Sequence, residues 1–274
     1  MSRVTDPLHA ELLGVAREAA ERAGELLRDG RPADLGVAAT KSSPVDVVTE
    51  MDIAAEKLIA ALIAERRPDD GMLGEEGASV SGSSGIRWVV DPLDGTVNYL
   101  YGSPSWAVSV AVEQDGETVV GVVACPPRGE TYEAVRGIGA WMTDALGDTR
   151  PLACRPSPTL DQALVATGFN YVAAVRRHQA SVAAGLIPSV RDIRRGGSAA
   201  LDLCDVAAGR LDGYYERGLR PWDLAAGDLV AREAGALTGG RPGRRPSGEL
   251  TIAASPGLFE PLRMLLEEAG AWHD

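Results

Sequence analysis

The chain has 274 residues, a formal net charge of −12 and a hydrophobic content of 45%. That length suffices for one large domain or two smaller ones with a full apolar core. The acidic charge argues against nucleic acid as a bulk partner, because a phosphate backbone demands clustered positive charge. An anionic small substrate stays possible, because bound divalent cations reverse the local field.

The first half of the chain is predicted to be α+β. Asp6-Pro7 is typical of an N-cap followed by the first helical position, and a long apolar face follows it. Gly- and Pro-rich turns separate runs with the composition of strands. The expected elements are the long first helix, a second helix over 53–65, strands over 71–74 and 86–91, and a meander over 106–112, 117–125, 131–136 and 140–143.

The second half is predicted to be α/β, because strand and helix patterns alternate there. Residues 147–158 are rich in proline and irregular, so we expect a seam between a domain over 1–146 and a domain over 147–274. The expected strands are 163–167, 190–194, 211–215 and 251–254, and the expected helices are 173–185, 199–208, 222–234 and one after Pro256.

The cysteines and the N-terminus indicate the compartment. Cys125, Cys154 and Cys204 are widely spaced without a ligand pattern, so we expect reduced thiols in a cytoplasmic protein. Charged residues occupy the N-terminus, where a signal peptide needs an apolar stretch. No run in the sequence is long and apolar enough to suggest a membrane span.

The most specific motif follows an expected buried strand that ends on Asp91. Asp94 comes three residues later, and carboxylates this close repel each other unless a cation lies between them. Mg²⁺ suits such hard oxygens, since it takes one or two carboxylates and keeps its waters. Gly95 and Thr96 offer backbone N–H groups at a helix start, which suits an anion. A plain turn is the alternative, because Asp-Pro and Asp-Gly are common turn dipeptides.

Three further acidic segments each have a structural alternative. Glu75 belongs to a Glu-Glu pair after an expected strand, and such a pair is usually solvated. Asp223 lies at an expected helix start, where an acid caps the helix and suits its dipole. Thr49 and Asp52 have the spacing of a capping box.

Together, the four segments resemble in order and spacing the inositol monophosphatase family of metal-dependent sugar-phosphate phosphatases. The resemblance covers about residues 10–260 and implies a layered α-β-α-β-α sandwich of the inositol monophosphatase and fructose-1,6-bisphosphatase type, a fold of mixed α+β and α/β character. The matching segments are 46–52, Gly74-Glu75-Glu76, 91–96 with Asn98, and 222–227, with weaker agreement at 194–200 and 212–216.

The resemblance implies a site for two or three Mg²⁺ ions, with Mn²⁺ as a substitute. The implied ligands of a first ion are Glu75, Asp91 and the carbonyl of Leu93, and those of a second are Asp91, Asp94 and Asp223. Glu75 is also implied to hold a third, looser ion.

The same resemblance implies hydrolysis by metal-activated water without a covalent intermediate. Thr96, together with Glu75 or Asp52, would orient that water, and the Gly95 and Thr96 amides would hold the phosphate. The implied contacts to the alcohol portion of the substrate are Gly197, Ser198 and Glu216.

Three positions are weaker candidates. Lys41 is one of only two lysines and lies just before Asp46 in an expected loop, where a solvated charge is the alternative. Asp46 opens the first matching segment. Arg220 occupies a place that varies within the family.

We therefore expect a phosphatase for inositol 1-phosphate or related polyol phosphates, working as a homodimer without nucleic-acid or membrane partners. A phosphatase of the same fold for histidinol phosphate, fructose 1,6-bisphosphate or adenosine 3′,5′-bisphosphate is the alternative. A moonlighting partner of the transcription machinery is an alternative from another class.

Overall fold

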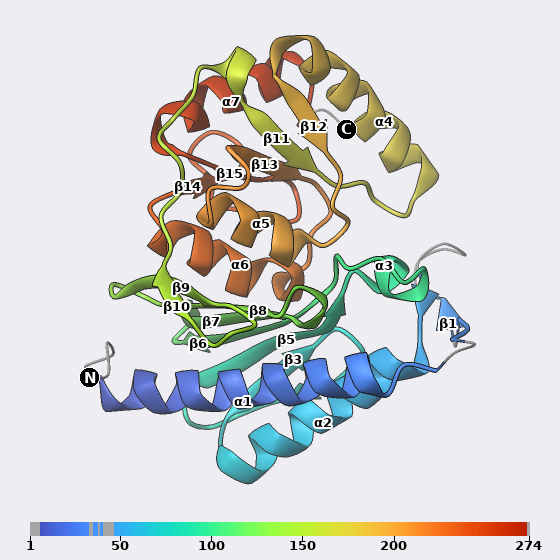
Figure 1. Ribbon diagram of the computed structural model, residues 1–274, viewed down its shortest axis with the longest axis vertical. Coiled ribbons are helices and arrows are strands. Elements are labelled where there is room, and N and C mark those ends of the chain that lie inside the picture. Colours follow the sequence, from blue (N-terminus) through green and yellow to red (C-terminus); the bar gives the residue numbers. More distant parts are fainter. Residues whose placement is uncertain (1–5, 33–34, 38, 41–46, 273–274) are drawn as a thin grey trace.

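The computed structural model describes residues 6–32, 35–37, 39–40 and 47–272. These residues form five layers in the order α-β-α-β-α, as Figure 1 shows. The predicted fold class is thereby confirmed. Lys41 and Asp46 lie outside the described residues.

The first sheet has eight strands in the order β10-β9-β8-β7-β6-β5-β3-β4. Its strands and the neighbouring helices are α1 (Pro7–Asp29), α2 (Glu50–Arg66), β3 (Gly71–Gly74), β4 (Ser79–Val80), β5 (Ile86–Asp94), α3 (Thr96–Leu100), β6 (Ala107–Gln114), β7 (Glu117–Cys125), β8 (Glu130–Val135), β9 (Gly139–Thr143) and β10 (Thr149–Pro151). Strands β1 (Ala39–Thr40) and β2 (Val47–Val48) pair as a separate two-stranded sheet.

The second sheet has five strands in the order β12-β11-β13-β15-β14. Its strands and helices are β11 (Leu164–Thr167), α4 (Ala173–Leu186), β12 (Asp192–Arg194), α5 (Ala199–Ala207), β13 (Gly213–Glu216), α6 (Pro221–Glu233), β14 (Leu237–Gly239), β15 (Thr251–Ala254) and α7 (Pro256–Glu268).

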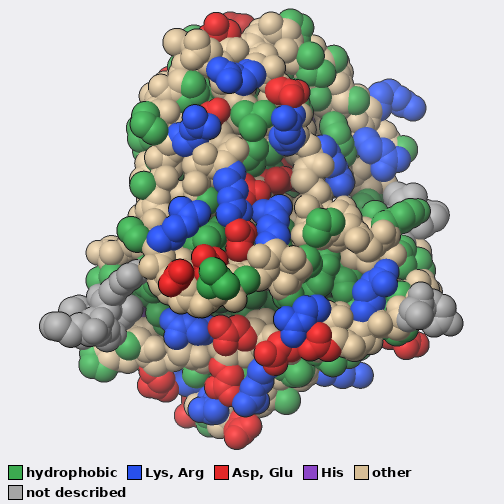
Figure 2. Space-filling view, in the orientation of Figure 1, with side chains coloured by type: hydrophobic (Ala, Val, Ile, Leu, Met, Phe, Trp, Pro, Cys, Tyr) green, Lys and Arg blue, Asp and Glu red, His purple; other side chains and the backbone are tan. Residues whose placement is uncertain are grey.

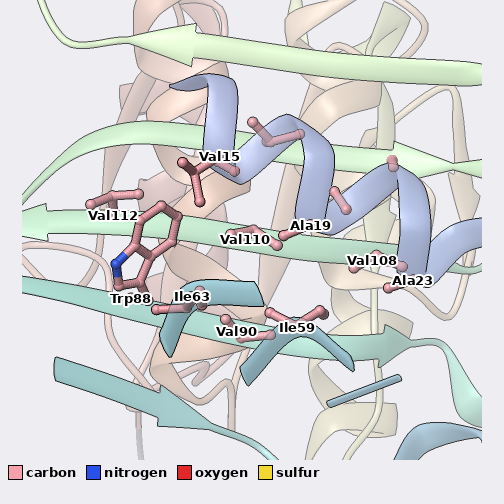
Figure 3. Packing of buried hydrophobic residues seen from close by; sticks show 14 of the residues in the cluster. Val15, Ala19, Ala23, Ile59, Ile63, Trp88, Val90, Val108, Val110 and Val112 are labelled. Atoms are coloured by element: carbon pink, nitrogen blue, oxygen red, sulfur yellow. The ribbon is translucent and has the colours of Figure 1, made fainter. Parts of the chain in front are cut away.

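Helices α1 and α2 cover the outer face of the first sheet and bury one cluster of apolar side chains (Figure 3). Because side chains alternate along a strand, Trp88 and Val90 of β5 join this cluster while Val89 packs on the opposite side. Asp6 accepts a hydrogen bond from the Leu8 N–H at 2.9 Å, so the predicted N-cap of α1 is confirmed.

Helices α5 and α6 lie between the two sheets, where both of their faces are covered (Figure 1). Leu229 of α6 packs toward the first sheet and Ala231 toward the second. Helix α7 covers the outer face of the second sheet. The middle helices α5 and α6 therefore contact both sheets.

Some predicted boundaries were wrong. The strand expected to end on Asp91 continues to Asp94, and the second helix begins at Glu50 rather than at residue 53. Strands β4, β10 and β14 escaped prediction because two or three residues show no periodicity. Strand β10 extends the first sheet into the stretch 147–158, and the division into 1–146 and 147–274 stays a prediction. None of the described helices is long and apolar enough to cross a bilayer.

Candidate active site

The site begins where two parallel strands end side by side. Strand β3 pairs in parallel with β5, with Gly74 opposite Val90. The next residues, Glu75 and Asp91, therefore emerge at the same edge of the sheet. The Glu75 N–H donates to the Val90 carbonyl at 3.1 Å, which fixes this pairing.

A bulge in β5 sets the spacing of the two aspartates. Asp91 pairs with Ser109 of β6 and Asp94 pairs with Ala107, so three steps along β5 match two along β6. The extra residue bends the strand out of the ladder. Within the bulge, the Asp91 carboxylate accepts the Leu93 N–H at 2.9 Å. The predicted turn contact of Asp91 is therefore present. It does not prevent Asp91 from also lining the pocket described below.

Asp94 points at the N-terminal end of α5. Its Oδ2 accepts hydrogen bonds from the Ser198 hydroxyl at 2.6 Å and from the Ala200 N–H at 2.8 Å. A carboxylate is stabilised at a helix N-terminus by the unpaired N–H groups and the helix dipole. Ser198 is 2% exposed and also caps α5. It lies behind Asp94, and its predicted contact with substrate stays a prediction.

Asp223 arrives from the opposite side, in the first turn of α6. Its Oδ2 accepts the Arg220 N–H at 2.7 Å, so the predicted capping role is confirmed. The Ser109 hydroxyl donates to the Trp222 carbonyl at 3.2 Å, and Ser109 is the strand partner of Asp91. This contact ties the start of α6 to the middle of the carboxylate site.

These elements surround one pocket, which lies in a hollow where Figure 2 shows acidic side chains flanked by basic ones. It brings together residues from both sheets and from both middle helices. The predicted site residues that line it are Glu75, Asp91, Leu93, Asp94, Gly95, Thr96, Gly197, Glu216, Arg220 and Asp223.

The carboxylates of this pocket raise one another's pKa values by electrostatic repulsion. Burial raises the pKa of Asp91 well above its usual range, and the charges of Glu75, Asp94 and Asp223 raise it further. Burial raises the pKa of Asp94 to about 6, against the hydrogen bond from Ser198. Burial and the charge of Asp94 raise the pKa of Asp223. A cation among these groups would remove the repulsion.

The donor set fits a hydrated hard cation. Among the described residues, no three His, Cys, Asp or Glu side chains are already gathered tightly enough to enclose an ion. Mg²⁺ requires no such cage, because it is held by one or two carboxylates and keeps several waters. Leu93 lines the same pocket, and its carbonyl, which lies 3.1 Å from the Thr96 hydroxyl, is a further hard oxygen.

Thr96 connects the pocket to a fully buried carboxylate. The Thr96 hydroxyl lies 2.9 Å from Oδ1 of Asp52 and 3.1 Å from the Leu93 carbonyl. The other carboxylate oxygen of Asp52 accepts the Thr49 N–H at 2.9 Å, so the predicted capping box is confirmed. Burial raises the pKa of Asp52, although the hydrogen bonds from Thr49 and Thr96 lower it.

Asp52→Asn should therefore lower kcat by at least about tenfold while the thermal midpoint changes little. The amide keeps one acceptor oxygen, so the loss of capping should cost about 1 kcal/mol or less. The partner of the Thr96 hydroxyl changes from a carboxylate to an amide, which weakens that hydrogen bond. The measurement is phosphate release beside thermal unfolding.

Thr49→Ala is the control, because it removes the cap hydroxyl that donates to Oδ2 of Asp52 and leaves the hydrogen bond between Thr96 and Oδ1 of Asp52 in place. It should lower stability with little effect on kcat. Equal and modest losses of rate and thermal midpoint in both variants would leave Asp52 with a capping role alone.

Glu216 lies at the end of β13 on the second sheet, across the pocket from the metal-binding candidates. The Tyr214 hydroxyl donates to its Oε2 at 2.7 Å. Gly168 leaves room for it, since a Cβ there would lie 2.0 Å from the same oxygen. Burial raises the pKa of Glu216 to about 7, against the hydrogen bond from Tyr214.

Several wall residues were not predicted. The loop over 168–171 lies on the wall because β11 ends beside β13, and nothing in its composition indicates a site. Arg195 lies in the segment 194–200, which resembles the family, so that resemblance could have indicated a residue of the site. The unpredicted lining residues are Gly168, Phe169, Asn170, Tyr171, Arg195, Arg217, Gly218, Leu219, Trp222 and Ala199.

Comparisons with known proteins identify the family of this chain. The sequence model of the inositol monophosphatase family matches residues 8–270. The inositol-1-monophosphatase SuhB of Mycobacterium tuberculosis is 43% identical over 274 residues, covering 94% of each chain. The Nus factor SuhB of Pasteurella multocida is 40% identical, covering 92% of this chain and 94% of its own.

Solved structures show the same fold. Mycobacterium tuberculosis SuhB superposes with a TM-score of 0.81 at 41% identity, covering 96% of this chain and 98% of that one. The IMPase of Thermotoga maritima superposes with a TM-score of 0.82 at 28% identity, covering 94% and 97%. The layered fold is thus that of the inositol monophosphatases. This chain belongs to the inositol monophosphatase family.

Proposed function

We propose that this protein is a Mg²⁺-dependent phosphate monoester hydrolase that acts on inositol 1-phosphate or related polyol phosphates. The observation that carries the proposal is the single pocket where β3, β5 and the first turn of α6 place their carboxylates. Family membership and the names of the relatives support the phosphatase class and the polyol substrate.

Glu75, Asp91 and the Leu93 carbonyl would hold one Mg²⁺ ion, and Asp91, Asp94 and Asp223 a second. Glu75 would share a third. Divalent ions held there would supply positive charge to the phosphoryl group and would lower the pKa of the attacking water. The contacts of Asp94 with α5 and of Asp223 with the Arg220 N–H hold both carboxylates in place before any ion binds.

Gly95 and Thr96 would bind the phosphate through their backbone N–H groups on the pocket wall. The Gly95 φ of +95° gives this turn a left-handed conformation, and a Cβ there would lie 2.9 Å from the Ser105 carbonyl. The Thr96 hydroxyl donates its proton to Asp52 or to the Leu93 carbonyl, so its lone pairs stay available to accept from the attacking water.

Glu216→Gln should weaken catalysis on inositol 1-phosphate and leave p-nitrophenyl phosphate hydrolysis nearly unchanged. A carboxylate on this wall can accept hydroxyl hydrogen bonds from a polyol, and a featureless leaving group offers none. We expect kcat/KM for inositol 1-phosphate to fall by about tenfold or more, the scale of a lost polar contact in a specificity site. Equal losses on both substrates would assign Glu216 to the metals or to the fold.

A substrate panel tests the proposed activity. Phosphate release is measured with Mg²⁺ on inositol 1-phosphate, histidinol phosphate, fructose 1,6-bisphosphate and adenosine 3′,5′-bisphosphate. We expect the highest kcat/KM on inositol 1-phosphate. A clear preference for any of the other three would replace the polyol phosphatase with that phosphatase of the same fold.

The name of the Pasteurella multocida relative favours a second candidate, a role with the transcription machinery. A catalytically inactive variant distinguishes the transcription role from the phosphatase role. An association with transcription complexes that persists in Asp94→Asn would establish a role independent of hydrolysis.

We also propose a cytoplasmic homodimer that binds neither nucleic acid nor membranes. The three cysteines are free thiols, of which Cys125 and Cys204 are buried, as a reducing compartment would favour. Analytical ultracentrifugation of the purified protein tests the dimer, and a monomer at micromolar concentration would contradict it.

A further inference from the structure

Glu56 of α2 reaches the loop that carries Glu75. The residue is 5% exposed, and its carboxylate accepts two backbone hydrogen bonds from that loop. Oε2 accepts the Glu76 N–H at 2.8 Å, and Oε1 accepts the Ala78 N–H at 2.9 Å. The two oxygens of one side chain thus join both ends of a three-residue segment.

The loop closes around this carboxylate. The Gly74 N–H donates to the Ala78 carbonyl at 2.7 Å. A Cβ on Gly74 would lie 2.2 Å from Oε2 of Glu56 and 2.7 Å from its carboxyl carbon, so no side chain fits at position 74 while Glu56 is in place. Gly77 has a φ of +112°, which L side chains rarely adopt. Both glycines of the Gly-Glu-Glu-Gly segment are therefore explained by the loop that Glu56 fills.

Glu75 is held by its neighbours on both sides. Its own N–H donates to the Val90 carbonyl, and the next N–H in the chain donates to Glu56. These two bonds fix the backbone around the Glu75 Cα and so the direction of its side chain toward the pocket. Burying a carboxylate is costly unless it is hydrogen-bonded, and charge-assisted bonds to backbone N–H groups offset that cost.

We propose that Glu56 is a positioning residue that forms the loop over 74–78 in advance, so that Glu75 is presented to a divalent cation before the cation binds. This inference rests on the proposed function, in which Glu75 is a metal ligand. Order that exists before binding does not have to be created by binding, which favours affinity.

The test compares Glu56→Gln with Asp70→Asn in metal-stripped protein. Asp70 precedes β3 at its other end, is also 5% exposed, and accepts bonds from Trp88 Nε1 at 2.9 Å and from the Ser84 hydroxyl at 2.6 Å. It is therefore a comparably buried carboxylate just before β3, at the other end of the strand from the loop over 74–78, although it also pairs with Arg67 at 2.9 Å. The readouts are Mn²⁺ binding by electron paramagnetic resonance, thermal unfolding and kcat at saturating Mg²⁺.

Glu56→Gln should raise the Kd for Mn²⁺ by about tenfold, equivalent to about 1.4 kcal/mol. The kcat at saturating Mg²⁺ should fall by less than about threefold, because the ion, once bound, orders the loop. Asp70→Asn should lower the thermal midpoint without moving the Kd for Mn²⁺. An unchanged Kd in Glu56→Gln, or the same increase in both variants, would overturn the positioning role.

A measurement on the unmodified protein covers the case in which Glu56→Gln does not fold. Hydrogen exchange of the Glu76 and Ala78 amides should be slow without metal, and rapid exchange there would contradict a preformed loop. The two proposals also fail differently. If the unmodified protein binds no Mn²⁺, both are overturned; if it binds Mn²⁺ and Glu56→Gln binds it equally well, the positioning role alone is overturned.

Discussion

Asp94→Asn should lower kcat by at least about 10²-fold while the protein stays folded, the scale for removing one electrostatic stabiliser of a transition state. The amide oxygen can still accept from the Ser198 hydroxyl and the Ala200 N–H, so the support from α5 survives. The lost charge is the one that would bind a cation. Phosphate release at saturating Mg²⁺ measures the effect.

The same substitution should stabilise the metal-free protein at high pH. Folding raises the pKa of Asp94 from 3.8 to about 6, so its favourable contribution is complete below pH 3.8 and is lost as the pH rises through about 6. Asn has no such loss. The thermal midpoint of Asp94→Asn should therefore exceed that of the unmodified protein most clearly above pH 6, and the difference should shrink toward pH 4.

Asp192→Asn is the control for both measurements. Asp192 is exposed, and the side-chain hydrogen bond from Arg194 lowers its pKa. This variant should keep its kcat and gain no stability at high pH. A near-normal kcat in Asp94→Asn would instead indicate that Asp94 has only a structural role in the turn.

Removal of divalent metal should abolish activity. After treatment with EDTA and dialysis, phosphate release should fall to background, and Mg²⁺ or Mn²⁺ should restore it. The physical reason is the mutual repulsion of Glu75, Asp91, Asp94 and Asp223, which a cation relieves. Mg²⁺ should also raise the thermal midpoint, because a ligand that binds only the folded state stabilises it.

The variant Asp94→Asn provides a further test of metal binding. Mg²⁺ should raise its thermal midpoint less than it raises that of the unmodified protein. Full activity in the metal-free sample would contradict the role assigned to the carboxylates.

The long elements of the fold were predictable because burial imposes a period on the sequence. Helix α1 shows an apolar face over many turns, and β7 is nearly continuous apolar sequence. The bulge between Asp91 and Asp94 was not predictable, because its cause is the pairing with β6. The parallel pairing of β3 and β5 is likewise a long-range fact.

The candidate site was predictable where the chemistry is carried by charged residues at short spacing. Asp91, Asp94 and Asp223 fell into segments with a recognisable order, and the pocket brings them together. Glu56 was missed because a glutamate within a helix usually lies on the solvent-exposed face. The wall loop over 168–171 was missed because its place follows from β11 and β13 pairing.

Crystals grown with Mn²⁺ and inorganic phosphate would locate the bound ions through the anomalous scattering of manganese. We expect manganese peaks against the carboxylates of Glu75, Asp91, Asp94 and Asp223, with phosphate beside the Gly95 and Thr96 amides. Manganese bound elsewhere on the protein, with none among these four carboxylates, would contradict the proposed metal site.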